Sequence, residues 1–271
     1  MLLGGFDGLH VGHKRLVESA KRYGVSVGLM TIVGGKVEAG LFTMTERMDI
    51  FRRAGVDFVF ELPFAEIKDI TPENFALLLQ REFMPQVFIC GEDFRFGAKA
   101  AGTPEMLKQA THVCVETHDL VQADGKKISS GTIKQLLKAG EVEKANALLG
   151  ERFFLIGEVF ADRKVGRTIG FPTANIKYPK DKFPLKIGVY ETRVAVDGKE
   201  YKGITNYGSR PTFDNQAVLT ETYLDGFNGD LYGKTLKIQF VRYLRDVQKF
   251  DNTECLSKQL EKDVKRVRNE N

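Results

Sequence analysis

The chain lacks most of the features that mark secreted, membrane-bound or nucleic-acid-binding proteins. Its three cysteines, Cys90, Cys114 and Cys255, are an odd number without the spacing of a metal site, which fits a reducing, cytoplasmic setting. No apolar run approaches the roughly 18 residues of a membrane span, and the N-terminus lacks the basic-then-apolar pattern of a signal peptide. With 40 basic and 36 acidic residues, the net charge of +4 is too balanced to indicate nucleic acid binding.

The length and composition indicate a globular protein of two domains. The chain has 271 residues, of which 42% are hydrophobic and 28% charged. We find no internal repeat and no low-complexity tract. The sequence pattern changes at Gly150, which ends a helical stretch. We therefore expect domains at residues 1–150 and 151–271.

The first half alternates between strand and helix patterns. Short apolar runs predict strands at residues 2–5, 25–33, 58–62 and 87–90. Helical spacing and caps predict helices at residues 14–23, 44–53, from 71 or 72 to 83, and 141–149. Alternating strands and helices predict an α/β domain with a doubly wound parallel sheet. Ligands of such domains bind at the carboxyl ends of the strands.

The second half has the pattern of an antiparallel sheet. Runs rich in β-branched and aromatic residues lie at residues 153–160, 189–196, 201–206, 220–224 and 235–241, with turns between them. We expect them to close into a small β-barrel. Residues 252–268 have apolar positions at helical spacing, which predicts a C-terminal helix packed on the barrel.

A glycine-rich loop follows the first predicted strand and reads Gly-Phe-Asp-Gly-Leu-His-Val-Gly-His over residues 5–13. His10 and His13 flank Gly12, so both rings can approach one small site while the backbone lies close to a phosphate. The candidate nucleotide-binding residues of this loop are Gly5, Phe6, Asp7 and Gly12. The alternatives are histidines that cap a helix or bind a metal, and an Asp7 that only forms a turn.

Two more segments of the first half suit nucleotide and ring binding. Residues 91–97 interleave aromatic and charged side chains, which can stack on a planar ring and bind ribose or phosphate. The alternative for Phe94 and Phe96 is packing in the core. Residues 128–134 place hydroxyl groups and a cation at a helix start, where they can surround a triphosphate. The candidate residues of these segments are Asp93, Phe94, Arg95, Phe96, Ser129, Ser130 and Lys134.

The second half holds a loop that suits a bound polyanion, Gly-Arg-Thr-Ile-Gly-Phe-Pro-Thr-Ala-Asn over residues 166–175. Its backbone N–H groups and a cation can face phosphate oxygens, while Thr173 and Asn175 can hold a hard cation such as Mg²⁺. The alternative is an ordinary turn between strands. The candidate nucleotide-binding residues are Gly166, Arg167, Gly170 and Pro172.

This loop closely resembles the signature loop of bacterial riboflavin kinases, the C-terminal half of two-domain riboflavin kinase/FAD synthetases. The His-x-Gly-His arrangement resembles that of the nucleotidyltransferase superfamily, and residues 62–64 and 91–97 match FAD synthetase segments. The resemblance implies a nucleotidyltransferase-type domain followed by a riboflavin kinase barrel. It implies ATP-dependent phosphorylation of riboflavin to FMN and adenylylation of FMN to FAD, with Mg²⁺, and with riboflavin, FMN, FAD, ATP and ADP as ligands.

The resemblance also implies roles for individual residues. Glu221 matches the glutamate that takes the proton of the terminal ribityl hydroxyl, and Arg245 matches an arginine beside the flavin. Phe64 matches a stretch next to the flavin of the synthetases, and His10 and His13 stabilise charge on the phosphates. From the residues alone, Glu221 could equally face water on a strand, and Arg245 could form a surface salt bridge.

The chain departs from the family pattern in its first half. Gly131 replaces the usual Ser or Thr, Lys134 replaces an Arg, and no His-Pro pair follows Thr31. One alternative is therefore a riboflavin kinase whose adenylyltransferase domain is weakened or inactive. A second alternative is a non-catalytic regulator that binds flavin or nucleotide. We expect neither nucleic acid nor a membrane as a partner.

Overall fold

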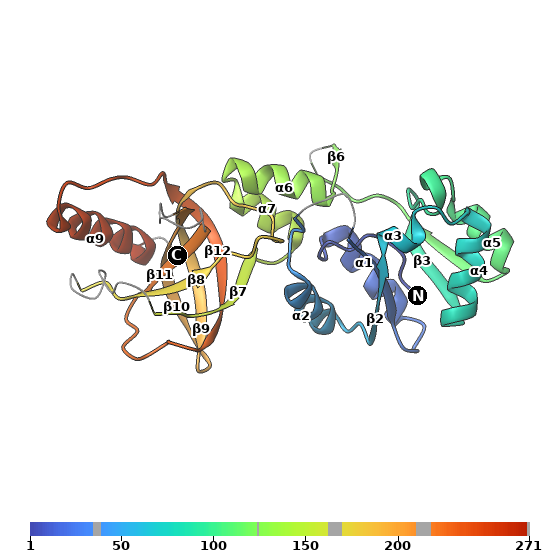
Figure 1. The fold of residues 1–271 in the computed structure, drawn as a ribbon, viewed down its shortest axis with the longest axis horizontal. Helices are drawn as coiled ribbons and strands as arrows, with labels where there is room; N and C mark the ends of the chain where they lie inside the picture. The colour runs from blue at the N-terminus through green and yellow to red at the C-terminus, as the bar shows by residue number, and fades with distance from the viewer. Residues whose placement is uncertain (35–38, 124, 162–169, 210–217, 270–271) are drawn as a thin grey trace. The chain divides into compact units, whose positions relative to one another are not determined.

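The computed structural model describes residues 1–34, 39–123, 125–161, 170–209 and 218–269 (Figure 1). The chain divides by its internal contacts into two compact units, Met1–Ser130 and Gly131–Asn271. This division falls before Gly150, because the helices that precede Gly150 group with the second unit. Gly150 as the boundary between functional domains stays a prediction. Among the described residues, no helix is long and apolar enough to cross a membrane.

The first unit is built on a parallel sheet, which confirms the predicted α/β class. Strand β1 (Gly28–Val33) pairs in parallel with β2 (Phe58–Pro63), and β3 (Val87–Gly91) pairs in parallel with β4 (Cys114–His118). Leu2 joins the two pairs through parallel bridges to Leu29 and Ile89. The strand predicted at residues 2–5 is therefore reduced to a bridge, because the chain bends away at Gly4 into the glycine-rich loop.

Side-chain caps set the starts of the helices in this unit. The Thr43 hydroxyl accepts from the Glu46 N–H, and the Glu46 carboxylate accepts from the Thr43 N–H. Thr71 caps the next long helix. The first helix begins earlier than its apolar spacing predicted, because His10 caps it. The helices are α1 (Val11–Lys21), α2 (Met44–Ala54), α3 (Phe64–Ile67), α4 (Pro72–Phe83) and α5 (Pro104–Thr111).

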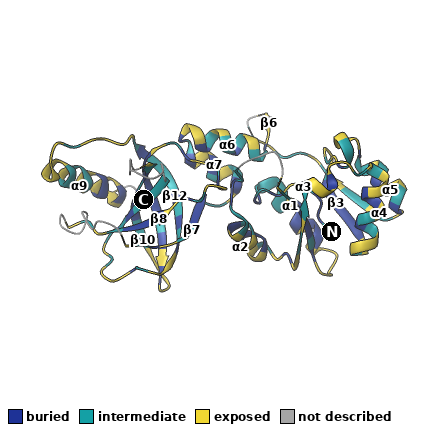
Figure 2. Ribbon diagram, in the orientation of Figure 1, coloured by how far each residue is buried: buried dark blue, intermediate teal, exposed yellow. Residues whose placement is uncertain are grey.

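The core of the first unit lies between the sheet and its helices. Phe88 of β3, Leu79 of α4 and Leu107 of α5 have no exposed surface. In Figure 2, β3 is largely buried, and exposed residues lie along the helices of this unit. Burying both faces of a parallel sheet leaves its carboxyl edge as the place for polar side chains. The loops at this edge carry the candidate site.

The second unit is an antiparallel β-barrel, as predicted. Its strand order is β7-β12-β9-β10-β11-β8, and a bridge between Phe160 and Asn175 nearly closes the ring. The sequence missed β8, since Thr173 and Asn175 were expected in a loop. A strand this short, directly after glycine and proline, has too little alternation to detect. The strands are β7 (Phe154–Glu158), β8 (Thr173–Lys177), β9 (Gly188–Val196), β10 (Lys199–Ser209), β11 (Val218–Leu224) and β12 (Thr235–Arg245).

Helices α6 (Ser130–Ala139), α7 (Val142–Leu149) and α9 (Thr253–Asn269) accompany the barrel. Asn146 fixes α7, because its Nδ2 donates to the Phe240 carbonyl at 2.9 Å and its Oδ1 accepts from the Phe153 N–H at 2.7 Å. The predicted C-terminal helix is confirmed as α9. It packs Val264 and Val267 against apolar residues of β9, β10 and β12.

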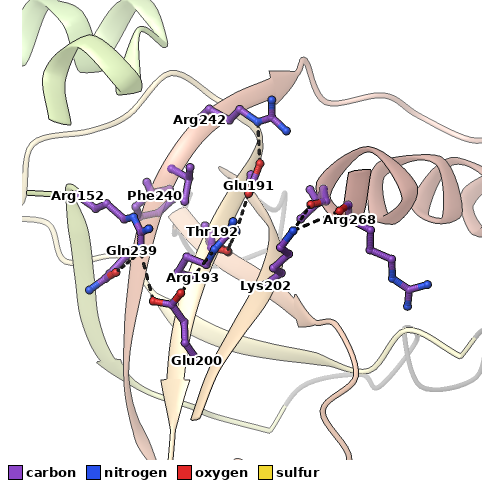
Figure 3. Close-up of polar contacts among 12 residues, drawn as sticks. Arg152, Glu191, Thr192, Arg193, Glu200, Lys202, Gln239, Phe240, Arg242 and Arg268 are labelled. Atoms are coloured by element: carbon purple, nitrogen blue, oxygen red, sulfur yellow. Dashed lines mark hydrogen bonds and ion pairs between the residues drawn. The ribbon is translucent and has the colours of Figure 1, made fainter. Parts of the chain in front are cut away.

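A buried ion cluster ties β9 to β12 (Figure 3). The Glu191 carboxylate lies 2.6 Å from Arg193 Nη1 and 2.7 Å from Arg242 Nε, and only 3% of its side chain is exposed. A carboxylate this deeply buried is tolerated because two guanidinium groups neutralise it. Arg152 extends the cluster to Glu200 at the barrel surface. Arg242 and Glu191 are paired across the two strands, next to a register irregularity of β12 between Phe240 and Arg242.

Candidate active sites

A cleft of about 380 Å³ lies at the carboxyl edge of the parallel sheet. Loops that follow the Leu2 segment, β3 and β4 line it, together with the segment that leads into α6. The structure thus brings together predicted residues that are more than a hundred positions apart in sequence. The predicted residues in this cleft are Gly5, Phe6, Asp7, His10, Gly12, His13, Asp93, Phe94, Arg95, Ser129 and Ser130.

The glycine-rich loop is held in an unusual backbone conformation. Phe6 has a φ of 39°, which is uncommon for a residue with a side chain. Its ring is buried, and its carbonyl oxygen lies 3.4 Å from Arg47 Nη1. Asp7 Oδ1 accepts from the Leu41 N–H at 2.8 Å, so this carboxylate holds a neighbouring loop. A direct contact of Asp7 with nucleotide stays a prediction.

The two histidines stack on each other at the start of α1. Their ring centroids are 3.6 Å apart, and a Cβ at Gly12 would lie 3.1 Å from the His10 ring, which is tight enough to push it aside slightly. His10 Nδ1 accepts from the His13 N–H, so the proton of neutral His10 is on Nε2. His13 Nδ1 lies 3.1 Å from the Gly8 carbonyl and must donate to it. His10 Nε2 is therefore a donor, whereas His13 Nε2 becomes one only on protonation.

Burial sets the charge of this pair. Desolvation lowers the pKa of His10 to about 4, and Lys127 adds to the effect. Desolvation, followed by the neighbouring His10, lowers the pKa of His13 to about 3. Both rings are thus neutral near pH 7 in the free protein. An anion bound beside them raises both pKa values, so the arrangement favours a ligand that carries negative charge.

The second loop of the cleft gives its aromatic residues different positions. Phe94 lines the cleft, whereas Phe96 is only 6% exposed and stacks on Phe75 in the core. Core packing thus accounts for the Phe96 ring, and its contact with flavin stays a prediction. Asp93 forms an ion pair with Lys127 across the cleft. Arg95 Nη1 donates to the Phe94 carbonyl at 2.8 Å, which holds its guanidinium near the loop backbone.

Other predicted residues lie outside this cleft lining or outside the described ranges. Phe64 begins α3 and is half-buried. Lys134 belongs to the second unit, where its ammonium lies 5.5 Å from the Phe183 ring centroid. Gly166 and Arg167 lie outside the described residues. The predicted roles of these residues stay predictions.

The barrel places Glu221 between two asparagines in one row. Glu221 of β11 pairs with Asn206 of β10 on one side and with Asn175 of β8 on the other. Asn206 Nδ2 lies 3.5 Å from Glu221 Oε2. Glu221 is half-buried and lines a cavity of about 90 Å³, so it does not face water like an ordinary surface strand residue. A carboxylate at the wall of a cavity can accept a proton from a bound ligand.

A hydroxyl chain on the opposite strand face keeps this row in register. Thr205 Oγ1 lies 2.9 Å from Thr192 Oγ1 and 2.8 Å from Thr222 Oγ1, and all three residues are fully buried. Because side chains alternate along a strand, Asn206 and Glu221 point to the other face. The locked register therefore fixes the distance between them.

Asn175 and Thr173 line a second cavity of about 330 Å³ in the barrel unit. Asn175 is 6% exposed, and its buried Oδ1 has no hydrogen-bond partner among the described residues. An unsatisfied buried amide oxygen is costly, and hard cations bind such oxygens. Thr173 and Asn175 therefore fit a divalent cation. The described residues hold no cluster of three His, Cys, Asp or Glu side chains that would compete as a metal site.

Other predicted barrel residues have clear positions. Pro172 lines the 330 Å³ cavity, and Gly170 has a φ of 81°, which favours glycine. Arg245 forms a two-pronged ion pair with Asp263 of α9, at 3.1 Å and 2.7 Å. The salt-bridge alternative thus describes Arg245 in the structure, and its contact with flavin stays a prediction.

Sequence reasoning missed several residues of both sites. Asn206 was expected only as the last residue of the strand run 201–206, because its neighbours depend on a strand register that the sequence does not show. Asp230 and Tyr232 line the larger barrel cavity from a turn. Lys127 and His118 line the cleft of the first unit. Lys127 was the easiest to detect, because it precedes the two serines that were selected.

A parallel α/β unit with stacked histidines in a cleft, followed by a barrel with a carboxylate beside a buried, unsatisfied amide oxygen, is typical of a two-domain enzyme that transfers phosphate-containing groups. Residues 1–132 match the FAD synthetase family, and residues 149–270 match the riboflavin kinase family. The chain belongs to the bifunctional riboflavin kinase/FMN adenylyltransferase family.

Relatives support this assignment over nearly the whole chain. The bifunctional riboflavin kinase/FMN adenylyltransferase of Bacillus subtilis is 32% identical, with 97% of this chain and 89% of that protein covered. The Haemophilus influenzae protein of the same name is 31% identical, with 97% and 91% covered. A crystal structure from Streptococcus pneumoniae described as a macrolide-efflux protein matches with a TM-score of 0.90 at 29% identity, and covers 100% of this chain and 93% of that one.

Proposed function

We propose that the protein makes both flavin coenzymes from riboflavin. ATP phosphorylates riboflavin to FMN in residues 151–271, and a second ATP adenylates FMN to FAD in residues 1–150, with release of pyrophosphate. The observation that carries the proposal is the row of Asn175, Glu221 and Asn206, because it sets a base directly beside a cation site. The histidine cleft of the first unit supplies a separate place for the second reaction.

In the kinase reaction, Glu221 acts as general base. It takes the proton of the terminal ribityl hydroxyl as that oxygen attacks the γ-phosphorus of ATP, and the bond from this phosphorus to ADP breaks. Thr173 and Asn175 would hold Mg²⁺, which would neutralise charge on the transferred phosphoryl group. Gly166, Arg167, Gly170 and Pro172 form the nucleotide loop.

In the adenylyl transfer, a phosphate oxygen of FMN attacks the α-phosphorus of ATP and pyrophosphate leaves. His10 donates from Nε2 to the phosphates, and His13 does so after the polyphosphate has raised its pKa from about 3. Ser129, Ser130 and Lys134 are the other residues that we assign to nucleotide binding. Phe64, Phe94 and the charged residues of the second loop hold the flavin.

Neither rival function has an observation in its favour. The replacements at Gly131 and Lys134 leave the cleft, its two histidines and its serines in place. A binding regulator needs no base beside a cation site, yet Glu221 and Asn175 lie in one row. We place the enzyme in the cytoplasm, where its three free cysteines stay reduced.

The test is to incubate the purified protein with ATP and Mg²⁺, together with riboflavin in one reaction and FMN in another. Chromatography then resolves the flavins. We expect FMN and FAD from riboflavin, and FAD from FMN. FMN alone would establish a kinase with an inactive first domain, and no product in either reaction would contradict the proposal.

A further inference from the structure

The side chain of Asn206 places a second oxygen acceptor beside Glu221, the proposed general base of the barrel site. Asn206 pairs with Glu221 across β10 and β11, and both line the same cavity of about 90 Å³. The separation of 3.5 Å between Asn206 Nδ2 and Glu221 Oε2 is at the long limit of a hydrogen bond. The two groups are thus neighbours on one wall of this cavity.

The unsatisfied atom of Asn206 is an acceptor. Its Oδ1 is buried and has no hydrogen-bond partner among the described residues. Such an oxygen destabilises the protein unless a donor reaches it. The reversed amide orientation would place Oδ1 against the Glu221 carboxylate, so the contact at 3.5 Å fixes which end of the amide is which.

We propose that Asn206 selects substrates whose reacting hydroxyl has a second hydroxyl next to it. The row offers two neighbouring acceptors, and adjacent hydroxyl groups of a polyol chain offer two neighbouring donors. Glu221 takes the proton of the terminal hydroxyl, and Asn206 Oδ1 accepts a hydrogen bond from the hydroxyl one carbon earlier. This inference rests on the proposed kinase function of the barrel and adds the feature of the ribityl chain that the site recognises.

The rigid strands of the barrel favour discrimination by Asn206 between substrates with and without the second hydroxyl. The buried threonine chain Thr192, Thr205 and Thr222 locks the strands that carry Asn206 and Glu221. The strand that carries the amide is therefore held against shifting toward a ligand that lacks the second hydroxyl. With such a ligand the Asn206 oxygen stays unsatisfied, and sites built to bind a hydroxyl reject analogues without it strongly.

The test compares riboflavin with its analogue that lacks the hydroxyl next to the terminal one. Values of kcat/KM for phosphorylation are measured for the wild type and for Asn206→Ala. We expect the wild type to prefer riboflavin by at least about tenfold and the variant to lose most of this preference. Asn206→Asp retains an oxygen in the same place and should keep the preference. The new carboxylate beside Glu221 should raise the pKa of Glu221 and so slow the reaction at low pH.

Controls separate this inference from the proposed function and from misfolding. FMN adenylylation by the same Asn206→Ala protein should match the wild type, and Lys199→Ala at the exposed start of β10 should keep the substrate preference. A wild type that does not phosphorylate riboflavin would refute the kinase function itself. An active wild type whose preference is unchanged in Asn206→Ala would overturn the inference alone.

Discussion

The two units solve the same problem, the handling of ATP phosphates, with different parts of their folds. In the first unit the proposed functional groups lie on loops at one edge of a parallel sheet, and burial keeps the two histidines of this edge neutral. In the barrel they lie on the strands themselves, where the pairing of β8, β11 and β10 brings Asn175, Glu221 and Asn206 into one row. A loop site tolerates a change of one residue locally, whereas a strand row fails if the register slips.

The comparison predicts the largest effect for a change of Glu221, the proposed general base of the kinase reaction. Glu221→Gln keeps the shape of the side chain but cannot take a proton, so kinase activity should fall about 10³-fold. FMN adenylylation should stay at the wild-type rate, because the first unit is untouched. Initial rates of ADP and pyrophosphate release measure the two reactions. Near-normal kinase rates would show that Glu221 is not the base.

The matching change in the cleft is His13→Ala. We expect FMN adenylylation to fall about 10²-fold, because one donor to the phosphates is lost, while riboflavin phosphorylation stays normal. The same two rates measure this variant. Arg22→Ala, just beyond the end of α1, is the control variant and should keep both activities. Asn146→Ala is unsuitable as a control, because Asn146 anchors α7. Equal loss of both activities in His13→Ala would contradict separate sites.

A third prediction concerns the buried ion cluster that joins β9 to β12 of the barrel. Glu191→Ala removes the carboxylate from between Arg193 and Arg242 and leaves buried positive charge. The barrel should lose about 3 kcal/mol of unfolding free energy. Urea unfolding followed by circular dichroism measures the loss. Lys234→Ala, which breaks an exposed ion pair with Asp197, is the matched control and should change little.

A fourth prediction concerns the cation site. Asn175→Ala removes the unsatisfied buried oxygen, so the Mg²⁺ concentration for half-maximal kinase rate should rise about tenfold or more. Asn175→Asp keeps an oxygen ligand and should retain metal binding. Titration of kinase rate with Mg²⁺ at saturating riboflavin distinguishes the two variants. An unchanged Mg²⁺ requirement in Asn175→Ala would remove Asn175 from the metal site.

The smallest predicted effect is the titration of the histidine pair. Since the chain has four histidines, their proton resonances can be followed by NMR. The signals of His10 and His13 should not titrate between about pH 8 and about pH 5, because burial lowers the pKa values to about 4 and about 3. Pyrophosphate should move both titrations upward. Ordinary titration in the free protein would contradict neutral buried rings.

These pKa shifts also have a consequence for stability. Each histidine has a folded pKa below its ordinary value of 6.5, so the unfolded chain binds more protons between these values. The contribution to unfolding free energy is complete above about pH 6.5 and is lost as the pH falls toward about 4 and about 3. Acid should therefore destabilise the first unit.

The contrast between a site on loops and a site on paired strands explains how much of the fold and of the sites could be predicted from the sequence. Each loop of the cleft is contiguous in sequence, so the glycine-rich loop with His10 and His13 was found together with the helix that follows it, although the strand predicted before it is only a bridge at Leu2. Fold class followed from periodicity in both halves. Asn206 was not recognised, because its neighbour Glu221 becomes visible only after β10 and β11 are aligned. β8 was missed because its alternation is too short, and Phe96 shows that a motif residue can also be a core residue.

The most direct test of the two-site account mixes two inactive proteins. Neither Glu221→Gln nor His13→Ala alone should convert riboflavin efficiently to FAD. An equimolar mixture should do so, because His13→Ala releases FMN that Glu221→Gln adenylates. FAD formation from riboflavin and ATP is followed by chromatography over time. Recovery of FAD in the mixture is the predicted result, whereas no FAD, although each variant keeps its own remaining reaction, would contradict two independent sites.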